Sequence, residues 1–271
     1  MFKYLLLFNL IFMQLNSFEL LHDFRGQFTE QLNLFKNVYT KNIVTNNLNL
    51  IPRKIHQIWI GPKQLPEKFD WMRETVKKLH PTWEYKLWTN EDLKDFNLKN
   101  QEVFDSVKNI GAKADIFRYE ILERFGGVYV DIDFELLKPL DDIITRSEFF
   151  GCLLCGTDLV SNGIIGSKSN HPILKECITQ ISMLRLFDNK GDNTTVLNMT
   201  GPYFFTDVIT KYLAQAHNQE NIIILPSDYF FPFPATQREN YWNSSLTRAN
   251  ILRYTKLETL GIHYWATSWQ D

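Results

Sequence analysis

Two aspartates end an apolar segment near the middle of the chain. The run from Val128 reads VYVDID, a hydrophobic strand pattern that finishes at Asp131 and Asp133. Because residues two apart on a strand point the same way, both carboxylates can face one point just past the strand. Two like charges this close repel each other, and a divalent cation with oxygen ligands, Mg²⁺ or Mn²⁺, relieves the repulsion. The D-x-D spacing alone is equally compatible with a turn that carries two solvated acids.

A second pair of charges lies on the segment directly before this strand. Residues 112–125 have the pattern of an apolar helix, and Gly126 and Gly127 end it. Asp115 and Arg118 are three residues apart and therefore share one face of that helix. Open α/β sheets bind ligands at the carboxyl ends of their strands. We therefore expect this pair to hold ligand hydroxyls in a crevice beside the two aspartates.

The elements that must position these side chains alternate along the chain. No repeat is visible, and no Ser/Gly-rich linker divides the chain after residue 50. The alternation predicts a single α/β domain over residues 51–271, with a largely parallel sheet flanked by helices. Strand patterns occupy residues 52–61, 84–88 and 128–132, and helix patterns occupy residues 67–80, 91–109 and 112–125.

The N-terminal part of the chain has a different character. Residues 1–17, MFKYLLLFNLIFMQLNS, place one Lys before an apolar run of about ten residues, which is too short for a comfortable bilayer span. This pattern is typical of a signal peptide or a weak signal anchor, and a buried N-terminal helix or strand is the alternative. Residues 18–50 carry apolar residues at helical spacing from Phe24 to Phe35, which predicts a helical stem. We expect the lumen or membrane of the secretory pathway in a eukaryotic host, and otherwise a membrane-associated or secreted protein.

Composition narrows the classes of function. The 271 residues carry 29 Lys+Arg against 31 Asp+Glu, so no cationic excess is present to bind a polyanion, and no nucleic-acid partner is expected. Cys152 and Cys155 have CxxC spacing, but no second pair completes a zinc site, so we expect structural cysteines. Aromatic residues make up 14% of the chain, enough both to fill a core and to line a site for a ring-shaped ligand.

The central segment resembles a known family. From Ala112 to Asp133 the chain matches A-x-A-D-x-x-R-Y-x-x-L-x-x-x-G-G-V-Y-x-D-x-D, the DXD sugar-transferase region of glycosyltransferase family 32. That family includes fungal outer-chain α-1,6-mannosyltransferases and the catalytic subunits of mannosyl inositol-phosphoceramide synthases. Further matches follow in family order, and the resemblance covers about residues 51–269. They are the opening strand IPRKIHQIWIG from Ile51, WEYKLW from Trp83, and HYWATSW from His263.

The resemblance implies a GT-A fold and a metal-dependent, retaining transfer of a hexose from a nucleotide diphosphate sugar. Mannose, galactose, glucose and GlcNAc are all donor sugars among related enzymes, and the acceptor would be a glycan, glycolipid or protein. Asp131 and Asp133 would be the catalytic residues and would bind the metal with His263. An imidazole beside two carboxylates favours Mn²⁺ over Mg²⁺. The implied donor-binding residues are His56, Gln57 and Trp59 near the base, Asp115 and Arg118 at the sugar and ribose, Asp131, Asn162 at the substrate, and Ser268 and Trp269 over the diphosphate.

Two other functions fit parts of the sequence. A strand ending in D-x-D also opens haloacid-dehalogenase-type phosphatases, but Glu135 stands where those enzymes usually have Thr or Val. A non-catalytic, secreted carbohydrate-binding protein would use the aromatic residues as platforms for sugars. His56 and His263 could each be packed histidines of the core. Incubation with a nucleotide sugar separates the three functions, since a transferase releases nucleotide diphosphate, a phosphatase releases phosphate and a lectin releases nothing.

Overall fold

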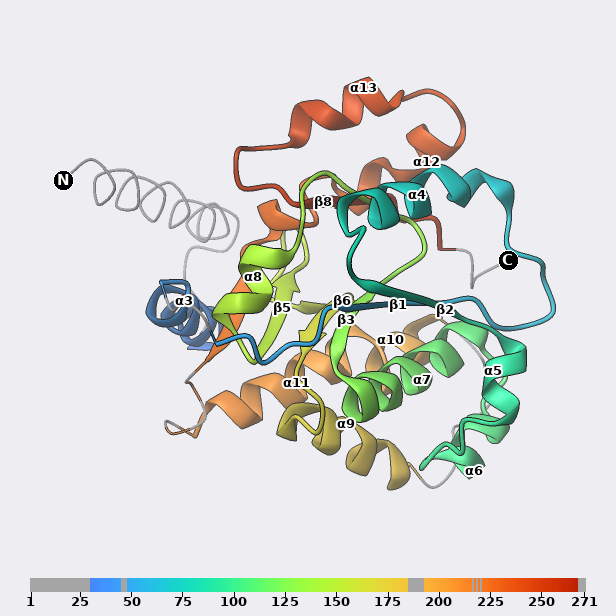
Figure 1. The fold of residues 1–271 in the computed structure, drawn as a ribbon, viewed down its shortest axis with the longest axis vertical. Helices are drawn as coiled ribbons and strands as arrows, with labels where there is room; N and C mark the ends of the chain where they lie inside the picture. Colours follow the sequence, from blue (N-terminus) through green and yellow to red (C-terminus); the bar gives the residue numbers. More distant parts are fainter. Residues whose placement is uncertain are drawn as a thin grey trace.

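The protein is described by a computed structural model that covers residues 30–44, 48–184, 193–215, 217, 219 and 221–267, with the backbone alone for residues 193–195. A six-stranded sheet in the order β2-β1-β3-β6-β5-β7 forms its centre, and β4 pairs with β8 beside it (Figure 1). The strands are β1 Lys54–Ile58, β2 Glu84–Trp88, β3 Gly127–Val130, β4 Phe134–Leu136, β5 Phe149–Leu153, β6 Val160–Ser167, β7 Ile222–Leu225 and β8 Gly261–His263.

Helices cover the sheet in two layers. In the view of Figure 1, α7, α9 and α11 lie below the sheet, and α4, α12 and α13 lie above it near β8. The helices are α3 Glu30–Asn42, α4 Asp70–Leu79, α5 Asn90–Lys94, α6 Gln101–Ser106, α7 Ile110–Phe125, α8 Asp141–Arg146, α9 Pro172–Ser182, α10 Asn193–Met199, α11 Pro202–Leu213, α12 Arg238–Trp242 and α13 Arg248–Ile251.

Strand direction identifies the type of sheet. β6 runs antiparallel to both of its neighbours, β3 and β5, whereas β1 is parallel to β2 and β3, and β5 is parallel to β7. The sheet is therefore mixed and mostly parallel, with helices on both faces. The prediction of a single α/β domain of the GT-A type is confirmed.

Helix α7 delivers its charged residues to the sheet and leads directly into β3. Its N-terminus is capped by Asn109, whose side-chain oxygen accepts hydrogen bonds from the N–H groups of Gly111 and Ala112 at 2.7 and 3.3 Å. Its C-terminus is Gly126, which adopts a φ of 62° that glycine tolerates best. Apolar side chains surround most of the helix, so it is buried. The predicted helix over residues 112–125 and the strand after it are confirmed.

The prediction of one helix over residues 91–109 is wrong. α5 and α6 are separated by a turn in which Asn97 takes a left-handed φ of 54°. The carboxylate of Glu120 on α7 accepts the backbone N–H groups of Lys99 and Asn100 at 2.7 and 2.9 Å. These two N–H groups donate to the buried carboxylate instead of forming the hydrogen bonds of a continuous helix. Because Glu120 lies about 20 residues away, the local sequence does not reveal this tertiary contact.

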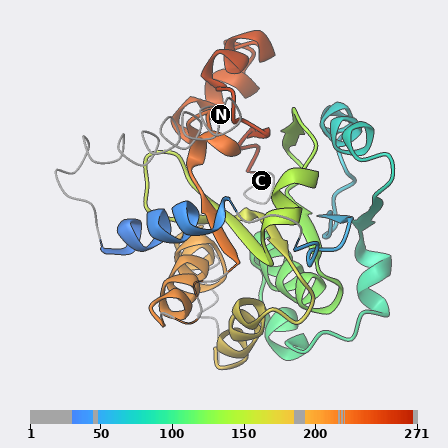
Figure 2. The same cartoon turned by 60° about the vertical axis from the view of Figure 1, so that its left-hand side comes forward.

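The described part of the N-terminal region packs onto the sheet. Figure 2 shows α3 beside the edge strand β7, where Phe35, Val38 and Tyr39 are fully buried. The side chain of Asn42 donates to the carbonyl of Ile222 on that strand at 2.8 Å. A covered edge strand is protected from pairing with other chains. The expected helix is therefore present over residues 30–42, whereas the predicted signal segment, residues 1–17, lies outside the described residues.

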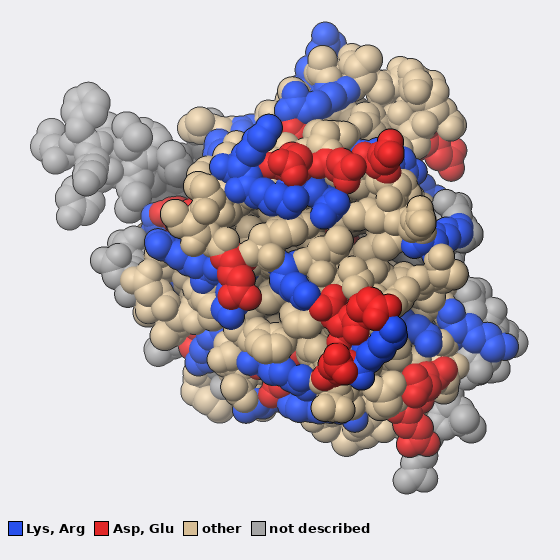
Figure 3. Space-filling view, turned by 45° about the vertical axis from the view of Figure 1, so that its right-hand side comes forward, with Lys and Arg blue, Asp and Glu red and all other residues tan. Residues whose placement is uncertain are grey.

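The distribution of surface charge and the character of the helices complete the description of the fold. Acidic and basic side chains are interleaved over the face that Figure 3 presents. Among the described residues, none of the helices combines the length and the apolar character that crossing a membrane requires.

His56 on β1 is part of the core. Its side chain is 2% exposed, its Nε2 lies 2.9 Å from the carbonyl oxygen of Gly126, and its Nδ1 accepts a hydrogen bond from the indole of Trp88 at 3.1 Å. A proton on Nδ1 would face the indole N–H, so these partners fit the neutral ring with its proton on Nε2. Burial lowers the pKa of His56 to about 4.

The first prediction concerns α3. Phe35→Ala empties a fully buried site and is expected to lower the free energy of unfolding by about 3–5 kcal/mol. Asn37→Ala, on the exposed face of the same helix, is expected to change it by less than about 0.5 kcal/mol. Urea unfolding of both variants measures the difference. Equal effects would show that α3 does not contribute to the stability of the domain.

The second prediction concerns pH. Between the unfolded pKa of 6.5 and the folded pKa of about 4, the unfolded chain binds a proton at His56 that the folded chain does not. Stability from this residue is therefore complete above pH 6.5 and is lost as pH falls towards 4. Unfolding measured at about pH 7 and about pH 4.5 should show a loss about 2–3 kcal/mol smaller in His56→Gln than in the unchanged protein. Identical losses would contradict this.

Candidate active site

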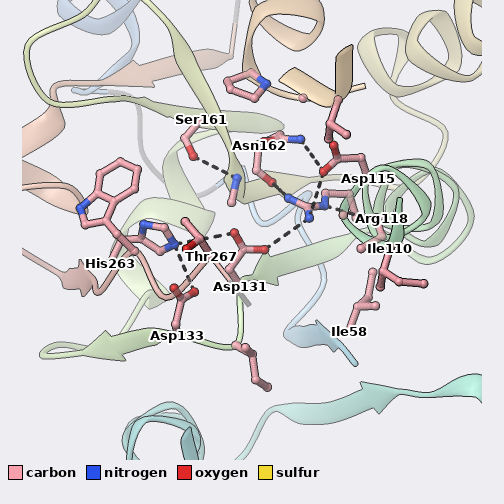
Figure 4. A pocket seen from close by; sticks show the side chains of 18 of the residues that line it. Ile58, Ile110, Asp115, Arg118, Asp131, Asp133, Ser161, Asn162, His263 and Thr267 are labelled. Atoms are coloured by element: carbon pink, nitrogen blue, oxygen red, sulfur yellow. Dashed lines mark hydrogen bonds and ion pairs between the residues drawn. The ribbon is translucent and has the colours of Figure 1, made fainter. Parts of the chain in front are cut away.

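A cavity of about 400 Å³ opens where β3 ends. Its walls come from the end of β1, the first half of α7, the middle of β6, the junction of α10 with α11, and residues 235–267. One side of the cavity is apolar, with Ile58 and Ile110 among its residues, and the other carries the charged side chains drawn in Figure 4. Ligand sites of proteins commonly combine an apolar lining with a few convergent polar groups.

Asp131, Asp133 and His263 meet on the polar side of this cavity. The Nε2 atom of His263 lies 3.1 Å from Oδ1 of Asp133 and 3.8 Å from Oδ2 of Asp131. One ligand atom from each residue lies within 4.8 Å of the others, close enough for one cation to contact all three. The pairing of β4 with β8 places His263 opposite Phe134, next to the second aspartate. The structure thus brings together the three predicted metal ligands.

The charges of this trio compensate one another. Burial opposes ionisation of His263, but Asp133 and then Asp131 outweigh it, so the pKa of His263 is raised. Burial likewise opposes ionisation of Asp133, yet the contact with His263 lowers the pKa of that carboxyl. For Asp131, burial dominates over the attraction of Arg118 and raises the pKa. A donor set of two carboxylates and one imidazole nitrogen fits Mn²⁺, which would bind the neutral form of the imidazole.

Arg118 holds the other oxygen of Asp131. Its guanidinium lies 3.4 Å from Oδ1 of Asp131 and 3.1 Å from Asp115, and it stacks over the ring of Tyr129 at 4.4 Å. The hydroxyl of Tyr129 donates to the same Oδ1 at 2.6 Å. Figure 4 shows Asp131 between Arg118 on one side and His263 on the other. Because Arg118 and Tyr129 both bind Oδ1, the other oxygen of Asp131, Oδ2, is the one available to a cation.

Asp115 and Asn162 form a fixed hydrogen-bonded pair on the wall. The side-chain amide of Asn162 donates to Asp115 at 2.8 Å, and the hydroxyl of Thr200 donates to the other carboxylate oxygen at 2.9 Å. The backbone carbonyl of Asn162 accepts from Arg118 at 2.6 Å. Burial raises the pKa of Asp115 to about 7, although Arg118 and the hydrogen bond from Thr200 oppose it. Asn162 thus lies within β6, not in a turn.

Three residues that sequence reasoning did not select shape this site. Tyr129 and Thr200 supply the hydrogen bonds described above, and Gly163 makes room for the carboxylate of Asp131. A Cβ atom at Gly163 would lie 2.6 Å from Oδ2 of Asp131, and the carbonyl of this glycine accepts the N–H of Asp131 at 2.8 Å. The sequence signals were the Tyr of the GGVY motif, the Gly of Ser-Asn-Gly at residues 161–163 and the Thr of Thr-Gly-Pro at residues 200–202.

The predicted base-binding residues of β1 divide into two groups. Trp59 lines the cavity, with its indole N–H donating to the carbonyl of Lys63 at 2.8 Å. His56 and Gln57 are not among the cavity-lining residues. Gln57 is fully buried and donates to the backbone carbonyl of Asp131 at 3.1 Å, so it positions the metal-site strand. The surroundings of His56 are those of a packed core histidine, the alternative to base binding that the sequence also allowed.

The segment after β8 turns into the cavity. Trp265 and Thr267 both line it and both adopt left-handed backbone, with φ of 53° and 46°. Between them, the N–H of Ala266 donates to Oδ2 of Asp133 at 2.7 Å. The predicted diphosphate contacts Ser268 and Trp269 follow immediately and lie outside the described residues.

The buried carboxylate of Glu135 accepts hydrogen bonds that stabilise this segment. Glu135 accepts hydrogen bonds from the hydroxyl of Tyr264 at 2.6 Å and from the guanidinium of Arg248. The indole of Trp242 on α12 donates to the carbonyl of Tyr264 at 2.8 Å. Hydrogen bonds therefore link both helices to Tyr264, the residue that follows His263: α12 through Trp242, and α13 through Arg248 and Glu135.

Comparisons with known proteins agree with this geometry. The family model described as "Glycosyltransferase sugar-binding region containing DXD motif" matches residues 66–150. The uncharacterized glycosyltransferase L373 of Acanthamoeba polyphaga mimivirus is 32% identical over 68% of this chain and 74% of its own length. Inositol phosphoceramide mannosyltransferase 3 of Schizosaccharomyces pombe is 30% identical over 62% of this chain, which spans 48% of that relative.

Among solved structures, the PaToxG glycosyltransferase aligns over 69% of this chain and 81% of its own, with 17% identity and a TM-score of 0.48. The relationship in sequence is the decisive one, because the mimivirus relative exceeds 30% identity over most of its length. The chain therefore belongs to the family of glycosyltransferases that contain the DXD sugar-binding region, enzymes that use a nucleotide-sugar donor.

Proposed function

We propose that this chain is a metal-dependent, retaining hexosyltransferase that moves a sugar from a nucleotide diphosphate sugar to a glycan, glycolipid or protein acceptor. The observation that carries the proposal is the meeting of Asp131, Asp133 and His263 beside Arg118 in one cavity. Family membership supports the reaction class, and the donor set supports a divalent cation, Mn²⁺ before Mg²⁺.

The proposed roles follow from position in the cavity. Oδ2 of Asp131, one oxygen of Asp133 and Nε2 of His263 would hold the cation beside the donor diphosphate. A cation bound there supplies Lewis-acid stabilisation for the departing diphosphate. Arg118 and Tyr129 fix Asp131 by its other oxygen, so the carboxylate keeps its orientation while the donor binds.

A second group of residues holds the donor's sugar. Asp115, Arg118 and Asn162 form one rigid network on the cavity wall and present polar edges to sugar and ribose hydroxyls. Trp59 lines the cavity at the end of β1, where the base is proposed to lie. Ser268 and Trp269, which continue from the inward-turning segment, are proposed to close over the diphosphate.

The proposed retention of configuration requires either a nucleophile on the opposite face of the sugar or attack from the face of the leaving group. Among the described residues that line the cavity, the carboxylates are Asp115, Asp131 and Asp133. Each already accepts hydrogen bonds or an ion pair from protein groups. A nucleophilic carboxylate would need a free oxygen facing the sugar, so this arrangement supports same-face attack over a covalent intermediate.

Relatives guide the choice of donor and acceptor. Several of them are named as mannosyltransferases, and those of Schizosaccharomyces pombe are named for inositol phosphoceramide. We therefore propose a mannosyl donor before galactosyl, glucosyl and GlcNAc donors, and a glycolipid before other acceptors. A site of action at membranes of the secretory pathway, with the N-terminal segment as signal peptide or anchor, is proposed on the same grounds.

The third prediction tests the metal site. Asp131→Asn removes a charged ligand and should reduce release of nucleoside diphosphate from the preferred nucleotide sugar with Mn²⁺ by at least about 100-fold. The matched control is Asp142→Asn, because Asp142 is a surface aspartate paired with Arg146, and it should retain activity. Chelation of the cation should abolish release in the unchanged protein.

The outcome also separates the alternative functions. A panel of GDP-mannose, UDP-galactose, UDP-glucose and UDP-GlcNAc is scored for nucleoside diphosphate and for inorganic phosphate. Phosphate release would indicate a phosphatase, and sugar binding without any release would indicate a carbohydrate-binding protein. Wild-type rates in Asp131→Asn would contradict the assigned site.

A further inference from the structure

Arg238 lies on the cavity wall outside the network described above. It is the first residue of α12 and follows a short 3₁₀ turn, Ala235–Gln237, whose first residue also lines the cavity. Its side chain is half-buried. Within the described part of the chain, neither a hydrogen bond nor an ion pair joins this guanidinium to another group.

Other arginines near the core are engaged. Arg118 binds two carboxylates, Arg248 binds Glu135, and Arg124 donates to two backbone carbonyls. A guanidinium carries several N–H donors in a planar fork that matches a carboxylate or a phosphate. A half-buried guanidinium that faces a ligand cavity without a protein partner is therefore positioned for an anion of the ligand.

Charge balance in the cavity leads to the same conclusion. The carboxyl groups of the described wall are those of Asp115, Asp131 and Asp133, and the guanidinium of Arg118 is already paired with the first two. An anionic group that enters this cavity therefore gains from a cationic side chain other than Arg118, which is already paired. The other Lys and Arg residues of the described wall are Lys63, which is exposed, and Arg238.

The position of Arg238 is fixed relative to the metal site. Trp242 lies four residues later, on the same face of α12, and its indole is bonded to the carbonyl of Tyr264. Phe69 packs against that indole ring edge-on at 6.0 Å, and Lys68 lies 4.6 Å above it. Because Tyr264 directly follows His263, this hydrogen bond links α12, which carries Arg238, to the segment that carries His263.

We propose that Arg238 binds a phosphate group of a substrate in this cavity through its planar guanidinium. The proposal rests on the proposed function and adds a residue to it. Two substrates can supply the phosphate: the diphosphate of the nucleotide sugar, or a phosphodiester in the acceptor. Arg238 accordingly determines affinity for an anionic ligand rather than taking part in bond breaking.

The experiment compares Arg238→Gln and Arg238→Lys with Arg253→Gln. Arg253 is a matched control, because it is an exposed arginine after α13 that does not line the cavity. The first arm measures the Kd of GDP and of UDP with Mn²⁺ by calorimetry. The second arm measures the KM of inositol phosphoceramide in detergent micelles at saturating donor, together with kcat.

Loss of affinity in either arm identifies the source of the phosphate. A Kd raised about tenfold in Arg238→Gln, partly restored in Arg238→Lys and unchanged in Arg253→Gln, assigns the donor diphosphate. An unchanged Kd with an acceptor KM raised about tenfold at similar kcat assigns the acceptor phosphate. Values within about twofold of wild type in both arms would overturn the role of Arg238. A wild-type protein that binds neither nucleotide and transfers no sugar would contradict the proposed function itself.

Discussion

Compensation of three neighbouring carboxylates, two buried and one half-buried, is the constraint on which this site depends. Asp115, Asp131 and Asp133 lie within one cavity, where each unpaired charge would be costly. Arg118 joins the first two, and His263 joins the last two, so the cluster forms a continuous chain of opposite charges. An enzyme that binds a cation and an anionic donor needs such a cluster to stay ordered before either arrives.

The fold serves this cluster by bringing distant segments together. β3 delivers two aspartates, and β8, more than a hundred residues later, delivers His263 through its pairing with β4. Contacts on each side then fix the strand end: Gln57 binds the carbonyl of Asp131, and Gly163 leaves space for its carboxylate. Behind β8, the network around Glu135 connects the site to α12 and α13. The same connection places Arg238 at the cavity wall.

Sequence reasoning succeeded where the signal is local. The α7 helix and the strand after it follow from an apolar helix ended by Gly126 and Gly127, and the D-x-D spacing identified two carboxylates that do share one site. It failed where tertiary contacts decide. Glu120 draws the backbone of residues 99–100 out of a helix, and the burial of His56 depends on three separate elements. Thr200 was missed because its hydroxyl binds Asp115, 85 residues away in the chain, and Tyr129 was missed because only the folded geometry shows that its hydroxyl binds Asp131.

One cation is proposed to bind between Asp131, Asp133 and His263 while a nucleoside diphosphate occupies the cavity. Crystals grown with MnCl₂ and GDP or UDP test it through anomalous scattering from manganese. We expect one strong peak about 2.0–2.4 Å from a carboxylate oxygen of each aspartate and from Nε2 of His263, with further contacts to the diphosphate. A nucleotide bound in the cavity without manganese at this place, or manganese held by other residues, would contradict it.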